Sequence, residues 1–233
     1  MPTTLVPLDV TEQVILTHAR GNGVQMGQHL REAWSQTFAH YWGSILLLQG
    51  RTVQAEAVLA DSVAWMEKKG TQHQWAGRMA WAWAARENGR PDRALDILRA
   101  AHPEQFVWEG DRQIHFNQLA ASHLALVQHA DAARLAAEAM ALDKGRFPFT
   151  PDGADSFLLR GRALLELGRA REAVESLAVA DAFWRNFDPA TPWAAEAAFW
   201  HGRGLLAVGE DRRGAAMIKA SLPALKASGL PSQ

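Results

Sequence analysis

Hydrophobic positions recur along this chain with the spacing of an α-helix, in paired stretches separated by a short break. The clearest pair surrounds Gly168, with Leu164 and Leu165 on one side and Ala173 and Leu177 on the other. Glycine can take a positive φ at a helix end without steric cost, so such a break predicts a tight turn between two antiparallel helices. Comparable breaks occur at four more positions, which are Gly50, Gly89, Gln128 and Gly209.

These breaks repeat at nearly constant intervals, with separations of 39, 39, 40 and 41 residues. Each unit also has a small residue seven positions before the break and another five positions after it, which lets two helices cross closely near their turn. Before the break these are Gly43, Ala82, Ala121, Gly161 and Gly202, and after it Ala55, Ala94, Ala133, Ala173 and Gly214. Equivalent positions predicted as apolar contacts are Leu46, Ala85, Leu124, Leu164 and Leu205, then Leu59, Leu98, Ala137, Leu177 and Ile218.

This pattern of small residues, turn and leucines resembles the tetratricopeptide repeat (TPR) family over residues 36–228. The resemblance implies an all-α fold, a right-handed superhelical solenoid of five helix–turn–helix repeats. A standard TPR unit has 34 residues, so the units here are similar to the longer variants found in bacterial regulators and kinesin light chains. HEAT-like and armadillo-like arrays remain alternatives, because their periods overlap 40 residues.

Prolines and polar residues support this division of the chain. Residues 1–35 form a lead-in with one helical stretch over 10–20, which would cap the exposed end of the array. Residues 36–228 hold the five repeats, and residues 229–233 form a C-terminal tail. Proline clusters fall between units, and Pro223 is expected to break the last helix.

Composition narrows the class of function. The chain has 233 residues, 48% of them hydrophobic, and a net charge of −1, so it can fill a core but lacks the positive field that nucleic-acid binding needs. No apolar run approaches the roughly 20 residues that span a bilayer, and cysteine is absent. We therefore expect a cytoplasmic protein that binds neither nucleic acid nor membrane.

The resemblance also implies a binding surface, because the first helix of each TPR-like unit lines the concave face. Arg162 and Arg203 occupy the same position in neighbouring units, a spacing suited to an acidic peptide, although each could instead pair with a carboxylate such as Glu166 or Asp155. Inward positions of the first helices are His40, Ser44, Met79, Trp83, Arg86, His115, Gln118, Ser122, Asp155, Leu158, Arg162, Glu196, Phe199 and Arg203.

Aromatic residues offer further candidates for binding. Trp81 and Trp83 are two positions apart and cannot share a helix face, which makes Trp83 a candidate for an exposed binding aromatic. Phe147 and Phe149, between two units, could contact a partner or pack under their own loop.

The motifs that carry catalysis are missing. Nine histidines include no His-Glu-x-x-His pair, and no nucleophile elbow or phosphate-binding loop occurs. We expect no catalytic residue, no metal and no cofactor.

The leading hypothesis is therefore a non-catalytic scaffold that binds another protein or a peptide in its concave groove. One alternative is a regulatory domain that senses a ligand or peptide beside a transcription regulator or kinase. Another is a self-associating assembly protein, in which Leu5, Val6, Leu8 and the loop aromatics Phe147 and Phe149 dock on a second copy as a homodimer.

Overall fold

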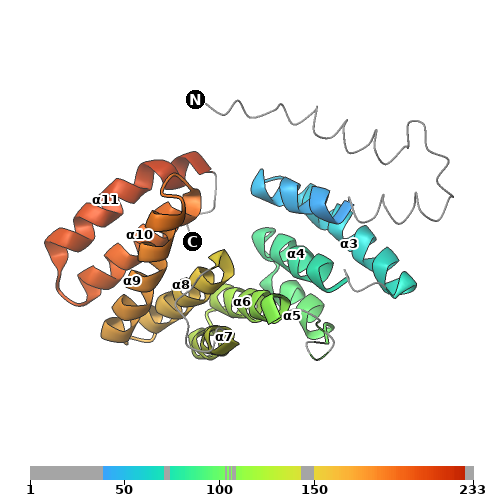
Figure 1. The fold of residues 1–233 in the computed structure, drawn as a ribbon, viewed down its shortest axis with the longest axis horizontal. Coiled ribbons are helices and arrows are strands. Elements are labelled where there is room, and N and C mark those ends of the chain that lie inside the picture. The colour runs from blue at the N-terminus through green and yellow to red at the C-terminus, as the bar shows by residue number, and fades with distance from the viewer. Residues whose placement is uncertain are drawn as a thin grey trace. The chain divides into compact units, whose positions relative to one another are not determined.

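A computed structural model describes residues 39–70, 74–102, 104, 106, 109–142 and 150–228. Within these residues every regular element is helical, which confirms the expected all-α class (Figure 1). The chain divides into two compact units, Met1–Ala84 and Ala85–Gln233.

In the first unit, a helix over residues 39–48 precedes α3 (Thr52–Lys69), and α4 (Gln74–Glu87) begins there and ends in the second unit. The second unit continues with seven helices in its described residues. These are α5 (Pro91–Arg99), α6 (Glu109–Ala125), α7 (His129–Leu142), α8 (Pro151–Glu166), α9 (Ala170–Phe187), α10 (Pro192–Ala207) and α11 (Asp211–Ser228).

The described helices form five helix–turn–helix pairs, as the period predicts. Four turns have a left-handed glycine, with φ between 72° and 85° at Gly50, Gly89, Gly168 and Gly209. At Gly168 the backbone N–H donates to the Leu165 carbonyl, and the next N–H donates to Leu164, both at 2.9 Å. These bonds satisfy carbonyls at the end of α8 and turn the chain directly into α9.

The third turn corrects the repeat frame. The left-handed residue there is Val127, with φ 61°, and not Gln128, which follows it. Val127 donates to Leu124 and Gln128 donates to His123, the same bonds that the glycine turns make. The small residues of this unit are therefore Ala120 and Ala132, both fully buried, in place of Ala121 and Ala133. Ala136 likewise replaces Ala137 as the buried contact of α7.

The small residues lie where the paired helices touch. Gly161 on α8 packs against the side chain of Leu177 on α9, and Gly43 packs against Leu59 in the same way. Gly202 on α10 and Gly214 on α11 bring two backbones together. In the second unit, α8 also packs against α6 and α10, so successive first helices lie side by side.

Two helices of the second unit begin at the expected proline-rich boundaries. Thr150 and Thr191 precede Pro151 and Pro192, and each threonine hydroxyl accepts a hydrogen bond from a backbone N–H in the first turn. The expectation for Pro223 was wrong, because α11 continues through it to Ser228.

Several sequence predictions fall outside the described residues. They are the cap helix over residues 10–20, the loop aromatics Phe147 and Phe149, the docking residues Leu5, Val6 and Leu8, and the tail over 229–233. None of the described helices is long and apolar enough to cross a membrane.

Candidate functional site

The first helices of the second unit are joined by polar side chains that reach from each helix to the next. Asn117 on α6 donates to the backbone carbonyl of Asp152 on α8 at 2.8 Å. Its side-chain oxygen accepts a hydrogen bond from the hydroxyl of Ser156 at 2.8 Å. Both side chains are buried, so this link belongs to the packed contact between two repeats.

The next link along the array joins α8 to α10 and is ionic. Arg162 Nη1 lies 3.1 Å from Glu196 Oε1, and the Arg162 guanidinium lies 4.6 Å from the Trp200 ring centroid. Arg203 also lies 4.6 Å from that ring and 3.8 Å from Glu166. Burial lowers the pKa of Arg162, and the carboxylate of Glu196 opposes that shift. Trp200 is thus contacted by two cations, each of which has a carboxylate partner.

At the other end of this row, Arg86 on α4 donates to the side-chain oxygen of Gln118 on α6 at 2.8 Å. Arg86 also lies 3.4 Å from Glu87. Burial lowers the pKa of Arg86, while Glu87 raises it. The charge of Arg86 is therefore desolvated and held between an amide and a carboxylate.

Asp155 connects the two ends of the row electrostatically. Its pKa is raised well above the usual value, chiefly by burial and further by the carboxylates of Glu196 and Asp152. Arg162 and Arg86 act in the opposite direction on the same pKa. The helices α4, α6, α8 and α10 thus present one polar row, which we call the charged wall, made of Arg86, Gln118, Asp155, Arg162, Glu196, Trp200 and Arg203.

Four other predicted groove residues of this unit, His115, Ser122, Leu158 and Phe199, are buried or partly buried. His115 is 3% exposed and makes edge contacts with Phe106 and Phe116, and burial lowers its pKa to about 4. Ser122 is fully buried, and its hydroxyl donates to the Gln118 carbonyl. Leu158 belongs to the hydrophobic core, and the partly buried Phe199 packs against that core.

In the first unit the predicted groove residues also serve packing. Met79 is buried, and Trp83 is partly buried and packs against a cluster that includes Leu46 and Leu59. A binding role for Trp83 stays a prediction. Ser44 donates its hydroxyl to the His40 carbonyl one turn earlier.

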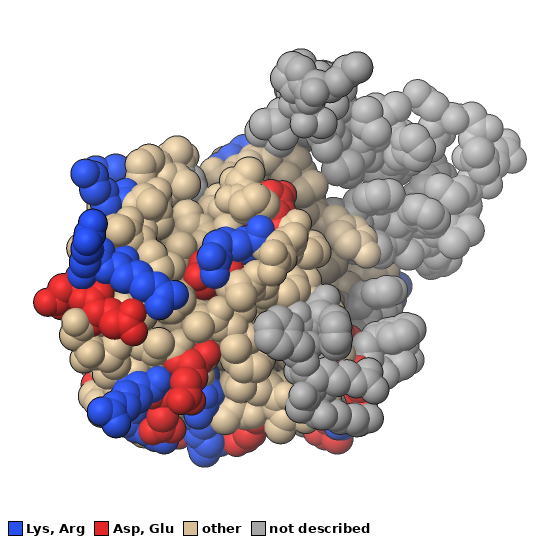
Figure 2. Space-filling model, turned by 60° about the vertical axis from the view of Figure 1, so that its left-hand side comes forward, with Lys and Arg blue, Asp and Glu red and all other residues tan. Residues whose placement is uncertain are grey.

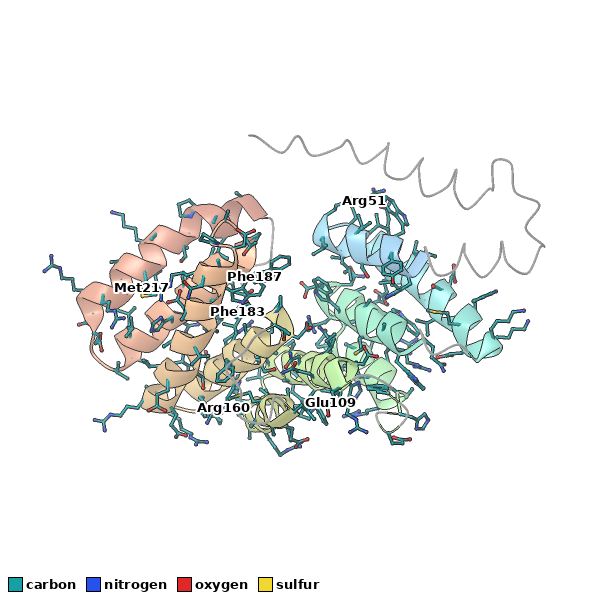
Figure 3. All side chains as sticks on the ribbon, in the orientation of Figure 1. Arg51, Glu109, Arg160, Phe183, Phe187 and Met217 are labelled. Carbon is teal, nitrogen blue, oxygen red and sulfur yellow. The ribbon has the colours of Figure 1, made fainter. Side chains whose placement is uncertain are left out.

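An aromatic cluster at the end of α9 was not singled out from the sequence. Phe187 is 59% exposed, and its ring stacks on the ring of Phe183 with the two centroids 5.3 Å apart (Figure 3). Both rings also make edge contacts with Trp184. Trp184 in turn stacks on Trp193 of α10, with the ring centroids 5.6 Å apart. Trp193 lies one helical turn before Glu196, which places this cluster beside the charged wall. Its sequence signal was the Phe-Trp-x-x-Phe spacing of residues 183–187, which puts three rings within about one turn.

The described residues contain no group of three or more histidine, aspartate or glutamate side chains placed to hold a metal ion.

Paired helices of about forty residues, turned by a left-handed residue and packed first helix to first helix, define a TPR-like helical-repeat fold. Solved structures share it, among them two titled as nearly identical TPR-like repeats of a "putative kinesin light chain" from Podosopora anserina. The first matches with a TM-score of 0.61 and 20% identity over 82% of this chain and 95% of its own. The second matches with a TM-score of 0.59 and 20% identity over 83% and 96%. No family model and no curated protein matches the sequence.

Proposed function

We propose that this chain is a non-catalytic scaffold that binds a peptide or a helix of another protein. TPR-like repeats generally bind other proteins or peptides, and this supports the general class of function. The observation that carries the proposal is the charged wall together with the neighbouring aromatic cluster, which exposes Phe187.

The charged wall favours a partner that carries both acidic and basic side chains over a purely acidic partner. Arg162 and Arg203 already have carboxylate partners in Glu196 and Glu166, so the wall offers both signs of charge. Arg203 keeps 44% of its side chain exposed and Glu166 keeps 40%, which leaves both able to form new contacts. We therefore propose that a bound segment pairs with these two groups in turn and places an apolar side chain against Phe187.

The proposal is tested with a double variant whose two substitutions leave buried residues unchanged. Phe187→Ala and Arg203→Ala together should weaken binding to a partner identified by pull-down and mass spectrometry, measured by isothermal titration. Truncating an exposed aromatic anchor and a charge at an interface costs about 1–3 kcal/mol, so we expect the affinity to fall about 5- to 150-fold.

Arg171→Ala is the matched control, because Arg171 is an exposed arginine on the second helix α9. Its affinity should equal that of the unchanged chain. If the Phe187 and Arg203 double variant binds the partner as tightly as the unchanged chain does, the charged wall is not the binding surface.

A further inference from the structure

The helix α11 ends the described array and is packed on one side only. Gly214 and Ser221 are buried, and Met217 and Ile218 are partly buried, on the side that faces α10. The opposite side of α11 is exposed.

Three cations lie on one face of that exposed side, and Pro223 lies inside the helix between the second and the third. Arg212, Lys219 and Lys226 are seven residues apart, which is close to two helical turns and spaces them about 10.5 Å apart on one face. None of the three makes an ion pair with any residue that the structure describes, whereas neighbouring Arg213 pairs with Glu210 at 3.3 Å. Figure 2 is turned so that the side of the molecule with α11 comes forward, and it shows several basic side chains on that side.

The equivalent face of α9 contacts the first helix of the next repeat, α10. Gly168 and Gly209 are equivalent turn residues, so α11 repeats α9 with an offset of 41. On α9, Val174 lies against Gly204 of α10, and Asp181 lies 2.9 Å from His201 of the same helix. The residues 41 positions later are Ala215 and Leu222, and Leu222 is 38% exposed. The exposed side of α11 therefore corresponds to a seat for one more helix.

Charge decides which helix fits this seat. Lys219 and Lys226 take the places that Ala178 and Arg185 have on α9, so an incoming helix would be flanked by two cations that pair with no residue that the structure describes. A second copy of α11 would oppose lysine to lysine, which is unfavourable. Ala215 and Ala216 lie between Arg212 and Lys219 on this face, and their small side chains permit close approach of a helix there. Leu222 and Pro223 lie between Lys219 and Lys226.

A membrane surface fits this face less well than a helix does. Basic helices that lie on bilayers insert bulky apolar side chains, whereas the apolar residues described beside this row are alanines, Leu222 and Pro223. Interhelical pairs between charges that flank an apolar seam are, in contrast, the usual means of selecting a helical partner.

We propose that the outer face of α11 docks an acidic α-helix of another protein, whose carboxylates recur about every seven residues opposite Arg212, Lys219 and Lys226. This surface is separate from the charged wall and does not depend on it.

The probe is a synthetic helical peptide of four heptads, with Glu at one position of each heptad beside a seam of Ala and Leu. Its affinity for the full chain is measured by fluorescence anisotropy. The triple variant Arg212→Glu, Lys219→Glu and Lys226→Glu should lower the affinity at least about tenfold, since each exposed pair is worth up to about fivefold and reversal adds repulsion. Raising the salt from about 0.1 M to about 1 M should weaken binding to the unchanged chain.

Three controls make the outcome decisive. The variant Lys68→Glu with Arg171→Glu reverses exposed cations elsewhere, and the Phe187→Ala, Arg203→Ala variant alters only the aromatic cluster and the charged wall, so both should bind the peptide within about twofold of the unchanged chain. A peptide with Lys in place of Glu should not bind. An unchanged affinity in the triple variant, confirmed folded by circular dichroism, would overturn the proposal. So would tighter binding to phosphatidylserine vesicles or to duplex DNA than to the peptide.

Discussion

Ser156 on α8 donates its hydroxyl to the side-chain oxygen of Asn117 on α6 across 2.8 Å, and both residues are buried. The two lie 39 residues apart in sequence, one in each of two neighbouring repeats. Asn117 also donates to the Asp152 carbonyl, so one amide holds two contacts between first helices. Stacking of the third and fourth repeats thus depends on a polar side chain inside an otherwise apolar contact.

Replacing that amide should destabilise the stack. Asn117→Ala removes two hydrogen bonds from a buried contact and should lower the free energy of unfolding by about 2–3 kcal/mol. Urea denaturation followed by circular dichroism measures this change. Ser156→Ala alone should cost less, and the double variant should cost less than the sum of the two. Additive effects would show that the two side chains do not interact.

The turn at Val127 is a place where the chain should gain stability. Val127 has φ 61° and is 72% exposed, so its branched side chain is strained and contributes little packing. Val127→Gly relieves about 1–2 kcal/mol of strain and loses about 0.5–1 kcal/mol through the entropy of the unfolded chain. We expect a net gain of about 0.5–1 kcal/mol and a higher Tm in a thermal melt.

The reverse change supplies the comparison. Gly168→Val introduces the same strain at an equivalent turn and should lower the Tm. If both variants melt at the same temperature as the unchanged chain, the left-handed turn is not strained in either case.

The crossing of α10 and α11 should not tolerate one added methyl group. A Cβ on Gly214 would lie 2.6 Å from the Gly202 carbonyl oxygen and 2.9 Å from Leu206 Cγ. Gly214→Ala must therefore push two backbones apart, and we expect a loss of about 1–3 kcal/mol in urea denaturation.

Gly110→Ala is the matched control for this prediction. Gly110 also lies in a helix, α6, but an added Cβ there meets no atom within 4 Å. The alanine should be neutral or stabilise by up to about 1 kcal/mol. Equal losses in the two variants would mean that helix propensity and not close approach sets the cost.

The raised pKa of Asp155 predicts a gain in stability at neutral pH when its charge is removed. A carboxyl whose pKa is higher in the folded state favours folding while protonated, and this contribution is lost as pH rises from the unfolded pKa of about 3.9 through the folded value. Asp155→Asn keeps the shape without the charge, so it should be more stable than the unchanged chain at pH 7. The difference should vanish below about pH 4. A variant that is less stable at pH 7 would show that the arginines need this carboxylate.

His115 predicts a loss of stability in acid. Its pKa is lowered to about 4 by burial, whereas an unfolded histidine titrates near 6.5. As pH falls between these values the unfolded chain binds a proton that the folded chain does not, so stability declines over this range by on the order of 3 kcal/mol and then levels off. His115→Gln removes this titration, and its unfolding free energy should vary less between pH 7 and pH 4. Parallel pH profiles would contradict the prediction.

Much of this fold follows from local interactions that can be predicted from the sequence. Helical period, proline boundaries and glycine turns all depend on residues within a few positions of each other. The third unit shows the limit of that reasoning, because it has no glycine at its turn. Val127 and Gln128 are then equally acceptable from the sequence, and only the hydrogen bonds to Leu124 and His123 decide between them.

The candidate site was predicted less completely than the fold. The sequence placed Arg162 and Arg203 on first helices of neighbouring units, and it raised carboxylate pairing as an alternative to peptide binding. It could not select Glu196 as the partner of Arg162, because that pairing joins residues 34 positions apart on different repeats. The burial of His115 and the exposure of Phe187 depend in the same way on what a neighbouring helix covers.

The sequence by itself determined the all-helical class, the forty-residue period and the small residues at each crossing, because these are set by backbone conformation and by contacts within one unit. Only the tertiary structure decided which polar side chains form contacts between repeats and which stay exposed. The reason is that burial and charge pairing are properties of two helices brought together, and no single repeat contains both.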